Sequence, residues 1–256
     1  MSKILIMAGH SQNGCLGSGA AKYINESNET RRLGQKVVAC LKSLGIDADY
    51  IQHDKPKTKN YLKEQVDKAN AMGTYDCVVQ IHFNAGSSDP NNNTTGTETY
   101  YRTSGGKPYS DRVNAKLSTL FKNRGSKKDA RGLYWLKNTR CPAILIEVCF
   151  VDDKDDADIY LNNIDKVAQL IAEGIADKDI SNKVEPAPIS DSFLVKIIYN
   201  GIEGLNIRQE PNTSSKIMGQ VYKGQVFTIV EIKNGFYKLK SGKGWISGNS
   251  KYVKKF

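Results

Sequence analysis

Two of the three histidines in this 256-residue chain lie at the ends of apolar segments that are typical of buried strands. His10 follows residues 4–7, and His82 follows residues 77–81. In a parallel sheet the carboxyl ends of the strands meet at one edge, where ligands bind. Catalytic zinc takes three protein ligands, often histidines, and leaves a fourth position open. The two histidines therefore indicate a metal site that needs one further ligand.

Glu26 and Glu29 are the candidates for that ligand. Leu33 and Val37 lie on the inward stripe of a helix that we expect to begin near Asn25. Glu26 precedes them by seven and eleven residues, close to whole helical turns, so its carboxylate would face inward. An inward carboxylate is costly unless it is paired. Glu26 is therefore the preferred ligand, although either glutamate could simply stabilise the helix N-terminus.

Glu147 is a carboxylate within an otherwise apolar segment, residues 143–150. A buried, unpaired carboxylate destabilises a fold and tends to take up a proton. A role as general base for a zinc-activated water would account for it. A serine hydrolase is disfavoured because the chain has no Gly-x-Ser-x-Gly elbow. The glycine-rich residues 14–19 lack the ending of a phosphate-binding loop and are expected to form a flexible loop near the metal.

The segments that must position these residues alternate between strand and helix. This alternation predicts an α/β domain with a mostly parallel twisted sheet flanked by helices. Strands are expected at residues 4–7, 46–51, 77–81, 97–101 and 143–150, helices at 33–44, 61–72, 113–121 and 164–175, and a loop at 84–96.

The C-terminal quarter of the chain has a different pattern. Residues 178–190 contain prolines and charges without periodicity, which is typical of a linker. Beyond them, short β-type runs alternate with turns and predict a small all-β barrel. We therefore predict a catalytic domain at 1–177, a linker at 178–190 and a second domain at 191–256.

The net charge of +10 is concentrated in this second domain. Residues 191–256 carry eleven Lys and Arg against four Asp and Glu, a net charge of +7. Such a surplus favours a polyanionic partner, which could be nucleic acid, a membrane or an anionic cell wall. The interleaved aromatic and basic pattern of a single-strand groove is not evident, so nucleic acid is disfavoured. No apolar run approaches the roughly 20 residues of a spanning helix.

The N-terminus and the cysteines indicate where the chain is made. The first apolar stretch is shorter than the core of a signal peptide, so we expect synthesis in the cytoplasm without a signal peptide. The five cysteines are scattered and show no disulfide or zinc-finger spacing, so reduced thiols are expected. Cys149 lies two residues after Glu147 and is expected to share its face of the strand.

Four ordered blocks resemble the zinc N-acetylmuramoyl-L-alanine amidases of bacterial autolysins and phage endolysins: Ala-Gly-His10, Asn-Glu26, Gln-Ile-His82-Phe-Asn-Ala, and Ala-Ile-Leu-Ile-Glu147-Val-Cys-Phe. The resemblance spans residues 3–175. It implies zinc ligands at His10, Glu26 and His82, a catalytic Glu147, and cleavage of the amide between N-acetylmuramic acid and L-alanine. This chain departs from the common pattern in having two nearby glutamates. The segment that begins at Arg131 also resembles one that lines the cleft in this family, and the resemblance assigns no role to it.

The C-terminal segment resembles the bacterial Src-homology-3-like repeat. The resemblance rests on residues 204–221, 223–225 and 244–246 and spans most of 193–256. It implies binding to the cell wall, through peptidoglycan or an anionic wall polymer. Trp245 is expected in the barrel core.

Together these features predict a lysin that hydrolyses peptidoglycan on the cell wall after release from the cell. A phage or prophage endolysin is favoured over a host autolysin. Two alternatives remain: a zinc peptidase that cuts within the stem peptide, and a wall-binding protein without catalytic activity.

Overall fold

The computed structural model describes residues 2–86, 95–179 and 192–255 and divides the chain into two compact units, Met1–Ile180 and Ser181–Phe256. Each unit has its own hydrophobic core. The predicted linker, residues 178–190, lies outside the described residues from position 180 onward, and so does the centre of the predicted loop at 84–96. The limits of the linker therefore stay a prediction.

A six-stranded sheet forms the centre of the first unit, with strand order β2-β1-β3-β6-β4-β5. β2, β1, β3 and β6 are parallel, β4 is antiparallel to β6, and β5 is parallel to β4. The predicted mostly parallel sheet is therefore confirmed. The strands are β1 (Lys3–Ala8), β2 (Asp47–Ile51), β3 (Cys77–Asn84), β4 (Thr97–Tyr101), β5 (Asn123–Lys128) and β6 (Ala143–Phe150).

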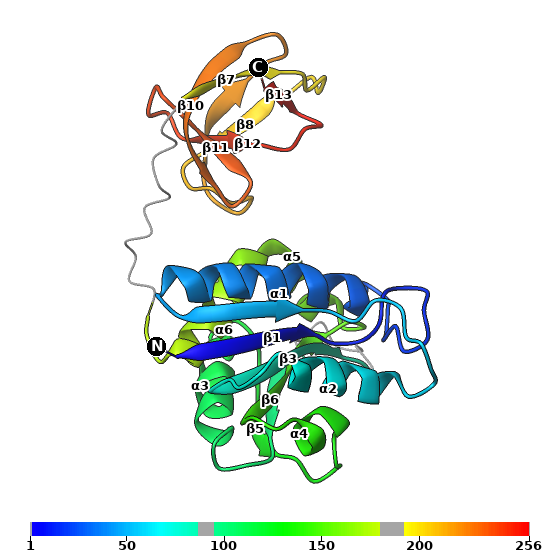
Figure 1. Ribbon diagram of the computed structural model, residues 1–256. Helices are drawn as coiled ribbons and strands as arrows, with labels where there is room; N and C mark the ends of the chain where they lie inside the picture. The colour runs from blue at the N-terminus through cyan, green and yellow to red at the C-terminus, as the bar shows by residue number, and fades with distance from the viewer. Residues whose placement is uncertain (1, 87–94, 180–191, 256) are drawn as a thin grey trace. The chain divides into compact units, whose positions relative to one another are not determined.

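Helices cover both faces of this sheet (Figure 1). One face carries α1 (Glu26–Ser43), α3 (Lys107–Leu117), α5 (Lys154–Asn162) and α6 (Ile164–Ala176). The other face carries α2 (Tyr61–Ala71) and α4 (Tyr134–Asn138). Strands buried on both sides are apolar at successive positions, which explains the continuous runs in β1, β3 and β6.

The start of α1 follows from local chemistry. Asn25 has an extended backbone, and its side chain accepts a hydrogen bond from the backbone N–H of Asn28 at 3.1 Å. Such an N-cap contributes about 1 kcal/mol to helix stability. Leu33 and Val37 are fully buried, as the inward stripe predicts. Glu26 is consequently the first helical residue, and its side chain is buried.

Two expectations about the first unit need correction. The helix predicted at residues 113–121 is α3, which begins at Lys107 because Pro108 suits its first turn, and which ends at Leu117. β5 is absent from the prediction because its sequence, Asn-Arg-Gly-Ser-Lys-Lys, is polar. A strand at the edge of a sheet needs no apolar pattern. The short α4 and the polar α5 also escaped prediction.

The second unit is a separate seven-stranded sheet in which the pairings are antiparallel. Its order is β13-β7-β10-β11-β12-β8-β9. This confirms the predicted small β domain, and Trp245 is buried as expected. The strands are β7 (Phe193–Ile197), β8 (Leu205–Arg208), β9 (Ile217–Val221), β10 (Val226–Lys233), β11 (Phe236–Leu239), β12 (Trp245–Ser247) and β13 (Val253–Lys255).

No helix within the described ranges is long and apolar enough to cross a membrane.

Candidate metal centre

His10 lies in the turn after β1, with a left-handed φ of 63°. Non-glycine residues in this conformation are uncommon and often mark turns or functional sites. Its Nδ1 lies 3.0 Å from the carbonyl oxygen of Gly17. Because a carbonyl can only accept, Nδ1 carries a proton, and Nε2 is the ring nitrogen that faces the other side chains of the cluster. That Nε2 lies 3.0 Å from Oε1 of Glu26.

The carboxylate of Glu26 is held from several directions. Oε1 accepts a hydrogen bond from the backbone N–H of Phe83 at 2.9 Å, and Oε2 accepts one from Ala20 at 3.0 Å. Burial acts to raise the pKa of Glu26, but the hydrogen bonds to His10 and His82 outweigh it and hold the pKa well below its usual range. Glu26 is therefore an anion in a fixed orientation.

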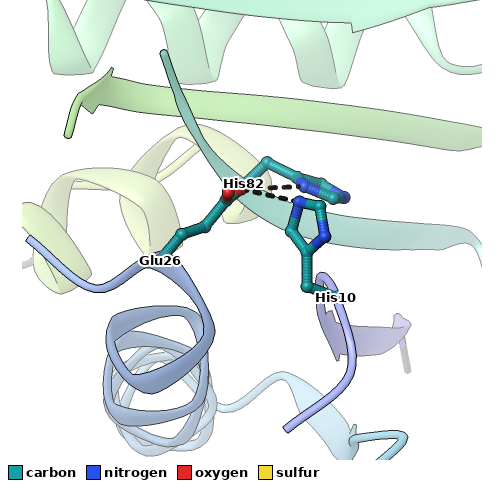
Figure 2. A group of neighbouring side chains, drawn as sticks. All are labelled: His10, Glu26 and His82. Atoms are coloured by element: carbon teal, nitrogen blue, oxygen red, sulfur yellow. Dashed lines mark hydrogen bonds and ion pairs between the residues drawn. The ribbon is translucent and has the colours of Figure 1, made fainter. Parts of the chain in front are cut away.

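His82, in β3, completes the cluster. Its Nδ1 lies 3.2 Å from Oε1 of Glu26, and its ring meets that of His10 edge to face, with the centroids 4.7 Å apart. Figure 2 shows both imidazoles beside the Glu26 carboxylate, with each side chain on a different segment of the chain. One ligand atom from each residue lies within 4.8 Å of the other two.

Glu29 is placed elsewhere. Its Oε2 accepts a hydrogen bond from the hydroxyl of Tyr160 at 2.9 Å and lies 3.3 Å from Nη1 of Arg32. The tertiary structure thus brings Glu26, and not Glu29, to the two histidines.

The glycine-rich loop at residues 14–19 packs directly on this cluster. A Cβ atom added to Gly19 would lie 2.6 Å from Oε2 of Glu26 and 2.9 Å from the ring of His10. Gly19 also has a positive φ of 75°, which disfavours other residues. The loop is near the site, as predicted, and its backbone contributes the Gly17 carbonyl that orients His10.

Glu147 lies beside the cluster because of strand register. It pairs with His82 across the parallel β3–β6 ladder and with Glu98 across the antiparallel β4–β6 ladder. Oε2 of Glu147 is buried and has no hydrogen-bond partner among the described residues. Burial, then the negative charges of Glu26 and Glu98, raises the pKa of Glu147 well above its usual range, while Arg131 opposes the shift. Glu147 is therefore suited to accept and hold a proton.

Glu98 is the site neighbour that sequence reasoning missed. It is buried, yet its carboxylate is paired: Oε2 forms ion pairs with Arg124 at 3.1 Å and with Lys127, and Oε1 accepts from the hydroxyl of Tyr100 at 3.0 Å. Burial opposes ionisation, but these partners lower the pKa of Glu98. The available signal was a carboxylate within a predicted strand, although the strand at residues 97–101 lacks the apolar run that identified Glu147.

The donor set fits zinc. Two imidazole nitrogens and one carboxylate oxygen are ligands that zinc accepts, and three protein ligands leave a position for water. The second carboxyl group, Glu147, lies next to this set with an unsatisfied oxygen. Such an arrangement is suited to metal-assisted hydrolysis of an amide or ester.

Comparison with known families agrees with this chemistry. Residues 4–177 match the N-acetylmuramoyl-L-alanine amidase family. The chain belongs to this family. Residues 195–254 match the bacterial SH3 domain, so the resemblances of both predicted domains are confirmed.

Relatives of the amidase include phage proteins. The endolysin of Bacillus phage SPP1 is 31% identical over 280 residues, which cover 99% of this chain and 98% of the endolysin. Among solved structures, the catalytic domain of the CD27L endolysin, which targets Clostridia difficile, is 33% identical with a TM-score of 0.63 and covers 70% of this chain and 99% of that domain. The catalytic domain of the amidase CwlV from Bacillus (Paenibacillus) polymyxa var. colistinus is 26% identical, with a TM-score of 0.58, over 69% of this chain and 97% of that domain.

The cysteines of the amidase lie outside the cluster and form no disulfide. The prediction that Cys149 shares a face with Glu147 is wrong. A register shift between β3 and β6 after Glu147 breaks the strand's alternation, and Cys149 packs with Ile146 and Val148 in the core under α1 and α6. Burial raises the pKa of its thiol well above the usual range, which makes it a poor nucleophile.

Proposed function

We propose that this amidase hydrolyses the bond between the lactyl carbonyl of N-acetylmuramic acid and the nitrogen of L-alanine in peptidoglycan, with zinc held by His10, Glu26 and His82. The observation that carries the proposal is the convergence of these three donors beside Glu147. When bound, zinc would supply Lewis acidity, which activates water and polarises the scissile carbonyl.

The residues of the chain supply orientation and proton transfer. Phe83 and Ala20 hold the Glu26 carboxylate, and Gly17 holds the tautomer of His10. Such outer contacts fix ligand geometry before the metal arrives. Glu147 accepts a proton from the attacking water and then delivers it to the L-alanine nitrogen as the carbon–nitrogen bond breaks. Its raised pKa suits it to hold the proton between the two steps.

Digestion of purified peptidoglycan tests this assignment. We expect mass spectrometry to detect free stem peptides that begin at L-alanine, together with intact glycan strands. A chelator should abolish their release, and added zinc should restore it. Cuts inside the stem peptide would instead support the peptidase alternative, and no cleavage of several wall types would support a binding protein. Membership of the amidase family favours the first result.

We further propose that residues 191–256 bind the cell wall, through an anionic polymer or peptidoglycan. Their net charge of +7 would attract such a polymer, and residues 195–254 match a bacterial SH3 domain. The protein would act on the wall after release from the cytoplasm, as an endolysin does.

Removal of the second domain should separate wall binding from chemistry. A chain ending at residue 179 retains both core clusters of the first unit. We expect it to cleave soluble muropeptides within about twofold of the intact protein, but to lyse intact walls about 100-fold less efficiently at low concentration, because tethering raises the local enzyme concentration. Turbidity loss and co-sedimentation with walls measure this. Equal wall lysis by the two proteins would contradict the targeting role.

Arg31 is expected to stabilise the metal centre without contacting the metal. Its guanidinium donates to the carbonyls of His10, Ser27 and His53 and pairs with Asp54 at 3.1 Å. It thereby holds the backbone of His10 in its unusual conformation. We expect Arg31→Met to weaken zinc binding about 10- to 100-fold, as losses of outer contacts do.

Competition with a chromophoric chelator measures that affinity. Arg32→Met is the matched control, because it removes the same charge from the same helix. Arg32 contacts Glu29, which lies outside the cluster. Equal zinc affinities in the two variants would show that Arg31 does not position His10.

A further inference from the structure

The loop after β5 presents one arginine, Arg131, on a rigid backbone. The carboxylate of Asp129 accepts hydrogen bonds from the backbone N–H groups of Arg131 at 3.0 Å, Gly132 at 3.1 Å and Leu133 at 3.0 Å. Asp129 is itself buried and pairs with Arg102 at 3.4 Å. Three backbone donors on one buried carboxylate hold the turn in a single conformation.

The side chain of Arg131 is stacked but has no anionic partner. Its guanidinium carbon lies 4.5 Å from the centroid of the Tyr100 ring, within the range of a cation–π contact. Throughout the described part of the chain, no carboxylate forms an ion pair with it, whereas the nearby Arg124 and Lys127 are both paired with Glu98. Arg131 is exposed, so its free donors face solvent.

This free cation lies next to the reactive groups. The hydroxyl of Tyr100 donates to Glu98, and Glu98 is the register partner of Glu147. The charge of Arg131 also acts electrostatically on Glu147. A substrate whose scissile bond lies at Glu147 would therefore come within the electrostatic reach of the Arg131 guanidinium.

We propose that Arg131 binds the free α-carboxylate of the second stem-peptide residue and makes the enzyme prefer walls in which that carboxyl group is not amidated. This inference rests on the proposed cleavage before L-alanine, because that cut places the second residue, a glutamate joined through its side chain, one residue from the reacting bond. A planar guanidinium binds a carboxylate through two parallel hydrogen bonds. A neutral carboxamide offers neither the charge nor the second acceptor.

Binding to a catalytically silent protein tests Arg131 independently of turnover. The probes are two disaccharide tripeptides that differ only in a free or amidated α-carboxyl group on the second residue. With zinc-loaded Glu147→Gln protein, we expect calorimetry to show at least about tenfold tighter binding of the free acid. Adding Arg131→Gln should bring the two dissociation constants within about twofold of each other. Arg131→Lys should keep part of the preference, because lysine retains the charge but lacks the paired N–H donors of the guanidinium.

Arg140→Gln is the matched control. Arg140 is an exposed arginine just before β6 begins at Ala143, whereas Glu147 lies in the second half of that strand. Replacing Arg140 therefore removes the same charge at a position away from the site. A tenfold preference that survives Arg131→Gln, or that disappears equally in Arg140→Gln, would overturn the inference. Failure of the wild-type enzyme to cleave either probe would instead count against the proposed function, since the binding comparison does not depend on cleavage.

Discussion

Replacing Glu147 with glutamine is expected to lower kcat by about 1,000-fold, within the range that general acid–base groups contribute. Glutamine keeps the size of the side chain but can neither accept the proton of the attacking water nor deliver one to the leaving nitrogen. Because none of the three donor atoms belongs to Glu147, zinc content should be unchanged. Turnover of a muropeptide, together with zinc stoichiometry of the purified protein, measures both effects. Near-wild-type turnover would remove Glu147 from its assigned role.

The same variant should alter the pH dependence of stability in the metal-free protein. The pKa of Glu147 is raised above its ordinary value of 4.5 in the folded state, so the folded state binds the proton more tightly than the unfolded chain. Wild-type stability should therefore decline as pH rises from about 4.5 toward the folded pKa, relative to the variant. Thermal unfolding at pH 4 and pH 8 measures this difference. If the difference in Tm between the wild type and the variant is the same at both pH values, ionisation of Glu147 does not lower the stability of the folded protein.

Removing the carboxylate of Glu26 should have the second large effect. We expect Glu26→Gln to lose zinc affinity by at least about 100-fold, since loss of an outer contact alone costs about 10- to 100-fold. Hydrolytic activity at low zinc should fall in parallel, and excess zinc should restore part of it. Metal analysis after dialysis against a chelator, followed by zinc titration, measures the loss.

Glu29→Gln is the control for Glu26→Gln. Both residues lie in the first turn of α1, but Glu29 is bonded to Tyr160 and Arg32, away from the histidines. Its replacement should leave zinc affinity within about twofold of wild type, because no donor atom changes. A larger loss of zinc affinity in Glu29→Gln than in Glu26→Gln would show that Glu29, and not Glu26, is the ligand.

Several features of this protein were decided by local sequence. Near-continuous apolar runs predicted β1, β3 and β6, because a strand buried on both faces is apolar at most successive positions. Helical spacing from Leu33 onward led to a helix expected to begin near Asn25, and the structure starts α1 there because the Asn25 side chain caps it, an effect that acts within a few residues of chain. The change of pattern before residue 191 indicated two domains, and the ordered blocks around His10, His82 and Glu147 indicated the family.

Other features depend on contacts between distant segments, and only the tertiary structure decided them. Helical spacing favoured Glu26 over Glu29 but left both open, and the packing of α1 between the His10 turn and β3 brings Glu26 to the histidines. Glu98 reaches Glu147 because β4 runs antiparallel to β6, and the register of that pairing cannot be deduced from either strand alone. A shift in the β3–β6 ladder turns Cys149 into the core, against the alternation that its spacing predicted. Local periodicity determines which face of an element is buried, whereas the meeting of two faces is set by the packing of the whole sheet.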